Sequence, residues 1–331
     1  MENNRSVVVS TRIRLARNVS TVPFLQNMDE KAARDVIDNV YDAIGKGYEL
    51  IELKNISAVD KQILVEQHLI SPDLLKSKWG ALILNKERTI SIMLNEEDHI
   101  RMQCILPGLA FSEAYAKIDE LDKKIESMLK YAYDSQFGYL TACPTNVGTG
   151  MRASVMMHLP ALTMQGRMTD VIRALSKFGL TVRGLYGEGS EALGNMYQLS
   201  NQVTLGVSEK EIINTIDNSA LHLANMEADT AKAIYAKNKI ETEDRLYRSY
   251  GIFKNAHKLD SKEMMSLLSD IWLAVSLGLL SGITYDELYE LMIKAQPAAI
   301  LKKAGGEINI LERDYIRAKM VREATKDITY S

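Results

Sequence analysis

Two arginines near the start of this chain are spaced in a way that could bind phosphate. Arg12 and Arg14 follow an apolar run at 7–9, in a segment expected to be extended, where side chains two residues apart point to the same side. Guanidinium groups bind phosphate through paired, charge-assisted hydrogen bonds. The spacing is therefore compatible with a phosphate clamp. It is also compatible with a solvated basic strand, which residue types alone favour.

A glycine-rich turn in the middle of the chain offers a second place for an anion. The turn runs from Cys143 to Gly150, after a strand expected over 138–143 and before Arg152, where an apolar segment is expected to be helical over 151–159. Backbone N–H groups at a strand-to-helix connection can point at a bound anion. No Lys-Ser or Lys-Thr pair follows Gly150, so this is not a Walker-type P-loop. A phosphate loop and an ordinary glycine turn both fit, and the residue types favour the turn.

Acidic residues occur at two positions where they could accept or donate a proton during a reaction. Glu96, Glu97 and Asp98 follow a hairpin expected from strands at 81–84 and 90–94, and neighbouring carboxylates repel each other unless a cation binds among them. Glu188 lies in a glycine-rich segment after a strand expected over 181–186, which is typical of a loop that closes over a substrate. Taken alone, the acidic cluster would be interpreted as a solvated turn.

The elements that position these residues divide into two regions. Strands and helices are mixed up to about residue 230, and from Ser208 onward helical periodicity continues to the end. We therefore expect an α+β protein with a mixed catalytic domain at 1–230 and an all-α domain at 231–331. Further helices are expected at 29–45, 59–69, 112–133 and 167–178, and further strands at 48–53 and 196–205. Predicted helix-capping boxes pair Ser208 with Glu211, Asp260 with Glu263 and Thr284 with Glu287.

Composition excludes several classes of function. Hydrophobic residues make up 46% and charged residues 25% of the 331, as in a globular protein, and the net charge of −3 argues against a broad nucleic-acid or membrane surface. The sequence has neither an apolar run of the roughly 18 residues that a membrane helix needs nor an N-terminal signal segment. Its two cysteines, Cys104 and Cys143, are far apart, so we expect a reduced, cytoplasmic protein without disulfides or structural zinc.

Four stretches, in chain order, resemble the active-site motifs of the phosphagen kinases, the family of creatine and arginine kinases. The resemblance implies an antiparallel sheet flanked by helices, and transfer of a phosphoryl group between ATP and a guanidinium. The stretches are Ser10-Thr11-Arg12-Ile13-Arg14-Leu15-Ala16-Arg17-Asn18, Asn95-Glu96-Glu97-Asp98-His99-Ile100-Arg101, Cys143-Pro144-Thr145-Asn146-Val147-Gly148-Thr149-Gly150 and Arg183-Gly184-Leu185-Tyr186-Gly187-Glu188.

The resemblance also implies which residues act. A guanidinium stays protonated near neutral pH and must lose a proton to attack phosphorus, so a carboxylate pair, Glu97 and Glu188, would orient it and accept its proton. Cys143 would help to position the substrate, with nearby arginines and the expected helix start favouring its thiolate. Mg²⁺ would be held by the phosphates and water, with no protein ligands assigned. The residues implied in ATP binding are Ser10, Thr11, Arg12, Ile13, Arg14, His68, Arg101, Arg152, Ala153, Ser154, Val155, Met156, Arg183, Gly184, Leu185, Tyr186, Gly187 and Glu188.

Within this family the chain resembles the bacterial protein arginine kinases of the McsB type. Its Ser-x-Arg-x-Arg motif begins at Ser10, so the helical domain that covers the site of small-molecule members is expected to be absent. Arg313, Asp314, Arg317 and Ala318 match a motif that in this family forms an allosteric phosphoarginine pocket; spacing alone favours a charged, exposed helix. The implied partners are proteins with exposed arginines, a heat-shock repressor, a zinc-containing activator protein, the Clp protease machinery and a second copy of the chain.

Two other functions stay open at this point. One is a kinase for a free guanidino metabolite, which the absent N-terminal domain disfavours. The other is a catalytically inactive adaptor that binds phosphoarginine through Arg313 and Arg317, which the presence of Glu97, Glu188 and Cys143 disfavours.

Overall fold

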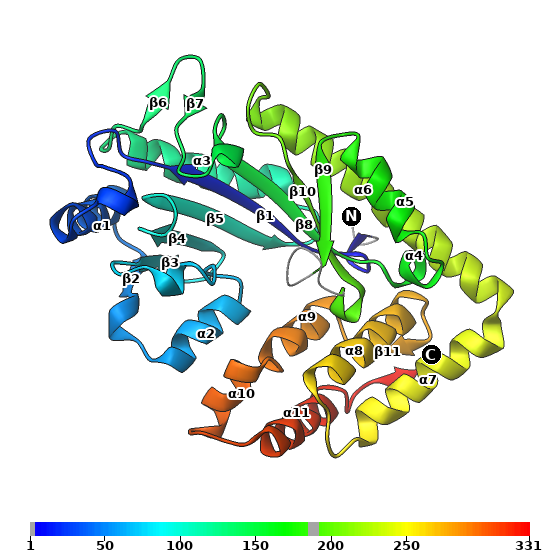
Figure 1. The fold of residues 1–331 in the computed structure, drawn as a ribbon. Helices are drawn as coiled ribbons and strands as arrows, with labels where there is room; N and C mark the ends of the chain where they lie inside the picture. The colour runs from blue at the N-terminus through cyan, green and yellow to red at the C-terminus, as the bar shows by residue number, and fades with distance from the viewer. Residues whose placement is uncertain (1–3, 185–191) are drawn as a thin grey trace.

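A mixed core and a helical region make up the fold, described here from a computed structural model for residues 4–184 and 192–331. Within these residues the centre is an eight-stranded antiparallel sheet (Figure 1). The prediction of an antiparallel sheet flanked by helices is confirmed. From one edge to the other, the strands are β2 (Tyr48–Glu52), β3 (Ala81–Asn85), β4 (Ile90–Leu94), β5 (Ile100–Pro107), β1 (Val8–Arg17), β8 (Met151–His158), β10 (Met196–Asn201) and β9 (Leu180–Gly184).

Strand β1 lies between β5 and β8 and carries the first arginine pair. The sequence predicts a strand only at 7–9, but the structure continues it through Arg17. The neighbouring β5, which carries Arg101, was not predicted. Strands β3 and β4 form the expected hairpin, with Leu82 opposite Met93.

The helix predicted over 151–159 is wrong, because these residues form β8. The strand is paired on both sides, with β1 and with β10. Met151, Ala153, Val155 and Met157 are fully buried, and His158 is nearly so. On the other face Arg152 and Met156 are only partly buried. Met156 interrupts the apolar–polar alternation, and periodicity alone does not separate such a short apolar run from a buried helix. The glycine-rich turn therefore joins two extended segments.

Helices cover one face of the sheet. They are α1 (Glu30–Ile44), α3 (Phe111–Glu126), α5 (Met168–Ser176) and the start of α6 (Glu209–Lys237), whose apolar residues share one core with β1, β5 and β8. Helix α1 begins at Asp29, whose side chain accepts a hydrogen bond from the Ala32 N–H, and ends at Gly45 with φ 77°. Helix α3 ends seven residues before the predicted limit of 133, and the strand predicted over 138–143 is reduced to β7 (Gly138–Tyr139), paired with β6 (Tyr133–Asp134).

Among residues 4–184 and 192–331, helices cover the opposite face at its two ends. At one end α2 (Ala58–Glu66) packs on β3 and β4 around Leu74 and Leu82. At the other end lies the helical region, drawn from yellow to red in Figure 1. It consists of α7 (Lys239–Asn255), α8 (Ser261–Ser276), α9 (Tyr285–Lys294), α10 (Pro297–Ala304) and α11 (Ile310–Ala324), with a short ribbon of β11 (Leu280–Ser281) and β12 (Thr329–Tyr330).

The two regions are joined at several points. The boundary expected near residue 230 falls inside α6, which continues to Lys237. Val9 of β1 belongs to the core of the helical region, and the indole N–H of Trp272 on α8 donates to the carbonyl of Ser6 at 2.8 Å. The expected capping boxes at Ser208 and Thr284 are present. None of the described helices is both long and apolar enough to cross a membrane.

Candidate active site

The strand register places the predicted arginines on one face of the sheet. Arg14 of β1 lies opposite Arg152 of β8, and Ala16 lies opposite Arg101 of β5. Opposed residues in an antiparallel pair share a face, as do alternate residues of one strand. Arg12, two residues before Arg14, therefore joins this group, and its Nε donates to the Ser154 hydroxyl at 3.4 Å.

Arg183 reaches the same face from the edge of the sheet. It lies opposite Gln198 of β10, which in turn lies opposite Met156 of β8. Met156 is four residues after Arg152 and so faces the same side. Five arginines from four strands therefore share the face that the helices α1, α3 and α6 leave uncovered.

The guanidinium groups on the arginine face repel one another. Burial, and then Arg101 and Arg152, lower the pKa of Arg12 to about 10. Burial, and then Arg12, Arg101 and Arg152, lower the pKa of Arg14 well below its usual value, with Glu96 acting in the opposite direction. The buried Nε of Arg14 has no hydrogen-bond partner among the described residues. A bound polyphosphate would supply both negative charge and the missing acceptor, so these residues fit the triphosphate of ATP.

The other residues predicted to bind ATP divide between the two faces. Ser10, His68, Ser154 and Met156 line a small cavity together with Arg12. Four others have side chains buried on the opposite, apolar side of the sheet, so any contact they make with a nucleotide would use backbone atoms. They are Thr11, Ile13, Ala153 and Val155. Gly184 ends β9. Leu185, Tyr186, Gly187 and Glu188 lie outside the described residues.

His68 is held next to the arginine face by its backbone. It follows α2 in a left-handed conformation with φ 59°, and its carbonyl accepts a hydrogen bond from the Gln103 side chain at 2.7 Å. Burial, and then Arg12, lower the pKa of His68 to about 4. The ring is therefore neutral near pH 7 and can accept or donate a hydrogen bond beside Arg12.

The two glutamates after β4 differ in surroundings. Glu96 is buried and forms a two-oxygen ion pair with Arg101, at 2.6 and 2.8 Å from Nη1. Glu97, the predicted catalytic carboxylate, is exposed and not bound to Arg101 in this way. Although the side chain reaches solvent, desolvation by the surrounding protein, and then Asp98, raise the pKa of Glu97, against the effect of Arg101. The sequence assigned no role to Glu96, although its place beside Glu97 was a signal that one of the pair is structural.

Asp98 joins the Glu97 loop to the Cys143 loop. Its Oδ1 accepts hydrogen bonds from the backbone N–H of Ala142 at 2.7 Å and from the Asn18 side chain at 2.6 Å. The thiol of Cys143 lies 3.0 Å from the Thr145 hydroxyl. The helix expected to start after the glycine-rich turn is absent, because those residues form β8, and Cys143 is instead the N-cap residue of a 3-10 helix at Pro144–Asn146.

Comparison with known proteins agrees with this geometry. Two family models match, the ATP:guanido phosphotransferase C-terminal catalytic domain over residues 29–230 and the protein-arginine kinase McsB C-terminal domain over residues 239–331. The protein-arginine kinase of Caldanaerobacter subterraneus subsp. tengcongensis is 46% identical over 97% of this chain and 97% of its own length. That of Bacillus subtilis is 45% identical over 96% of this chain and 89% of its own.

The chain belongs to the protein-arginine kinase family of ATP:guanido phosphotransferases. Solved structures of other guanidino kinases share the fold. A lombricine kinase superposes with a TM-score of 0.62 at 25% identity, over 70% of this chain and 68% of that chain. A duplicated taurocyamine kinase from Schistosoma mansoni, with bound transition state analog components, gives a TM-score of 0.60 at 26% identity over 67% of this chain. This chain spans 33% of the length of that duplicated kinase.

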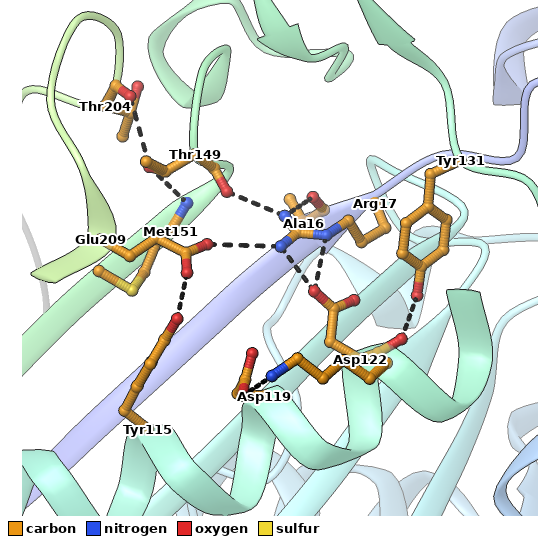
Figure 2. Close-up of polar contacts among 11 residues, drawn as sticks. Ala16, Arg17, Tyr115, Asp119, Asp122, Tyr131, Thr149, Met151, Thr204 and Glu209 are labelled. Carbon is orange, nitrogen blue, oxygen red and sulfur yellow. Dashed lines mark hydrogen bonds and ion pairs between the residues drawn. The ribbon is translucent and has the colours of Figure 1, made fainter. Parts of the chain in front are cut away.

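Arg17 is a residue of this protein-arginine kinase that the sequence analysis left without a role. Figure 2 shows its guanidinium at the centre of a polar cluster. It donates to Asp122 of α3 at 2.7 Å and to the carbonyl of Thr149 at 2.9 Å, and Glu209 lies 3.6 Å away. The group also lies 3.6 Å from the centroid of the Tyr139 ring. Arg17 therefore fixes the end of the glycine-rich turn against β1 and α3.

The predicted phosphoarginine motif lies on α11, partly inside the protein. Arg317 is fully buried and donates to the carbonyls of Leu259 and Ala295 and to Asp314, so the alternative of a charged, exposed helix is wrong for this residue. Ala318 is also buried. Among the described residues, Arg317 Nη2 and Arg313 Nε are buried without a hydrogen-bond partner. Such donors fit an anion, which is the chemistry expected of a phosphoryl-binding pocket.

Among the residues that the structure describes, no three His, Cys, Asp or Glu side chains are grouped as a metal site.

Proposed function

We propose that this chain is an ATP-dependent protein arginine kinase, which transfers the γ-phosphoryl group of ATP to arginine side chains of other proteins. The observation that carries the proposal is the convergence of Arg12, Arg14, Arg101, Arg152 and Arg183 on one sheet face. That face is next to the loop of Glu97, through the ion pair of Arg101 with Glu96. The family membership of the chain supports the same reaction.

The arginines bind the phosphates and stabilise the charge that spreads over the transferring phosphoryl group. Glu97 and Glu188 hold the acceptor guanidinium and take up its proton, and Cys143 positions it. Mg²⁺, held by the phosphates and water, would neutralise phosphate charge. Contacts with the nucleotide extend along β1 and β8 and past His68.

The same proposal covers partners and regulation. Phosphorylated proteins are passed to the Clp protease machinery, a heat-shock repressor is among the substrates, and a zinc-containing protein is the activator. Residues 1–230 form the catalytic domain and 231–331 the helical domain, which carries the dimer contact and the phosphoarginine pocket of Arg313, Asp314, Arg317 and Ala318. We place the enzyme in the cytoplasm.

The test is an incubation of the purified chain with Mg-ATP and an arginine-rich protein, read by mass spectrometry that preserves the acid-labile P–N bond. Free arginine is incubated in parallel, and a Glu97→Gln variant controls for contaminating kinases. Phosphoarginine on the protein, lost in the variant, supports the proposal. The sequence similarity to lombricine and taurocyamine kinases favours a second candidate, a kinase of a free guanidino compound. Phosphate on free arginine alone would establish that candidate. Phosphate on neither would leave two options, the phosphoarginine-binding adaptor or a kinase that needs its activator.

A further inference from the structure

A tyrosine from the helical region reaches the arginine face. Tyr289, on α9, lines the same small cavity as Arg12, His68 and Met156, which come from β1, the end of α2 and β8. Tyr289 and Arg12 are close enough to influence each other's charge. The catalytic region and the helical region therefore share this end of the site.

Tyr289 stands at the boundary between that cavity and a larger groove. The small cavity has a volume of about 20 Å³, room for about one water molecule. The adjoining groove has a volume of about 470 Å³ and shares Ser10, Ile105 and Tyr289 with the cavity. Its wall also includes the apolar Leu69, Leu106 and Ile293. Gln67, Glu87, Arg88 and Glu290 complete the lining, most of whose exposed surface is apolar.

The arginines and the groove lie in the order expected for the two ends of a nucleotide, with the triphosphate at the arginines and the base in the groove. The triphosphate needs the guanidinium groups, and Arg12 is the last of them along β1 towards Ser10. Beyond Arg12 most of the exposed lining is apolar and includes the aromatic ring of Tyr289, which suits a flat heteroaromatic base. Burial raises the pKa of Tyr289, so near pH 7 its phenol is neutral and offers an aromatic face and a hydroxyl.

We propose that Tyr289 contacts the nucleoside end of bound ATP, so that the helical region completes the nucleotide site of the catalytic region. This inference rests on the proposed function, because it takes the arginine face to bind ATP. The position of α9 is itself fixed from behind, since Arg317 Nε donates to the carbonyl of Ala295, the residue at which α9 ends, at 3.0 Å.

The experiment compares ATP with inorganic tripolyphosphate, which has the phosphates but no base. Full-length Tyr289→Ala and Tyr289→Phe variants are titrated with each ligand by calorimetry, and kcat and KM are measured for ATP. Loss of one stacking contact predicts that Tyr289→Ala binds ATP about tenfold more weakly. Tripolyphosphate binding should stay unchanged, kcat at saturating ATP should change by less than about twofold, and Tyr289→Phe should retain most of the affinity. Tyr315→Ala, a half-exposed tyrosine of α11, is the matched control.

Equal weakening of ATP and tripolyphosphate, or no weakening of either, would overturn the inference. If Tyr289→Ala loses its fold by circular dichroism, Tyr289→Leu, which keeps apolar bulk, is put through the same comparison. The outcome is separable from the proposed function. A wild-type chain that binds ATP but phosphorylates no protein would refute the kinase proposal, and the contrast between the two ligands would still decide the role of Tyr289.

Discussion

The carboxylate of Asp98 accepts a hydrogen bond from the backbone N–H of Ala142 at 2.7 Å, and each residue is the neighbour of a predicted catalytic residue. Asp98 follows Glu97, and Ala142 precedes Cys143. Asn18, directly after β1, donates to the same carboxylate oxygen. A single buried acceptor therefore fixes the two loops relative to the strand that carries Arg12 and Arg14.

Removing the Asp98 carboxylate should misplace the guanidinium that receives the phosphoryl group, without disturbing the phosphates of ATP. We expect Asp98→Ala to lower kcat by about 10- to 100-fold, because small misplacements of reacting groups cost rates of that order, with little change in ATP affinity. Asp98→Asn keeps the Oδ1 acceptor and is the matched control, with a smaller loss in kcat. Steady-state kinetics and ATP titration measure both effects, and equal losses for the two variants would argue against a positioning role.

The rate should depend on pH through Glu97. Desolvation by the surrounding protein and Asp98 raise the pKa of Glu97, and a group that accepts a proton must be ionised. Activity should therefore fall as the pH drops through this raised pKa, at a higher pH than the usual glutamate value of about 4.3 allows. Asp98→Asn removes a negative charge, so the acid limb of kcat/KM should move to lower pH. A limb in the same place in both proteins would show that another group titrates.

Arg17 should be important for stability. Arg17→Ala leaves the charge of Asp122 buried without its partner and frees the carbonyl of Thr149. Breaking a buried pair in this way costs about 3–5 kcal/mol in the free energy of unfolding. Arg34→Ala, which breaks solvent-screened pairs with Asp38 and Glu52, should cost much less. Urea denaturation measures both, and similar values for the two variants would contradict the assignment.

The phosphoarginine pocket should be tested at Arg313 rather than at Arg317. Arg317→Ala would leave two buried carbonyls and Asp314 unpaired, so a loss of response could reflect a destabilised fold. We expect Arg313→Ala to weaken stimulation of the kinase by free phosphoarginine about tenfold, the cost of one charge-assisted contact. Lys319→Ala, an exposed cation on the same helix, is the control. If stimulation by phosphoarginine is unchanged in Arg313→Ala, the proposed pocket is contradicted.

The sequence predicts the motifs of this site better than the elements that carry them. Helix α1 could be predicted because it has a capping residue, a glycine stop and one apolar stripe. Strand β8 could not, because the consecutive apolar residues Val155, Met156 and Met157 interrupt the alternation that identifies a strand. The structural role of Arg17 could not be predicted for another reason. Its partners are 105 and 132 residues away, and no local pattern indicates a contact over such distances.

The hydrogen bond from Trp272 to the carbonyl of Ser6 has a consequence for folding during synthesis. A ribosome releases Ser6 and β1 long before it releases α8, yet Val9 is covered by the core that α8 helps to build. Strand β1, which precedes the other described strands in the chain, is thus an inner strand of the sheet, and one of its ends is enclosed only after α8 has been translated. In the nascent chain this end of β1 therefore stays exposed to water and to chaperones until the helical region has been synthesised.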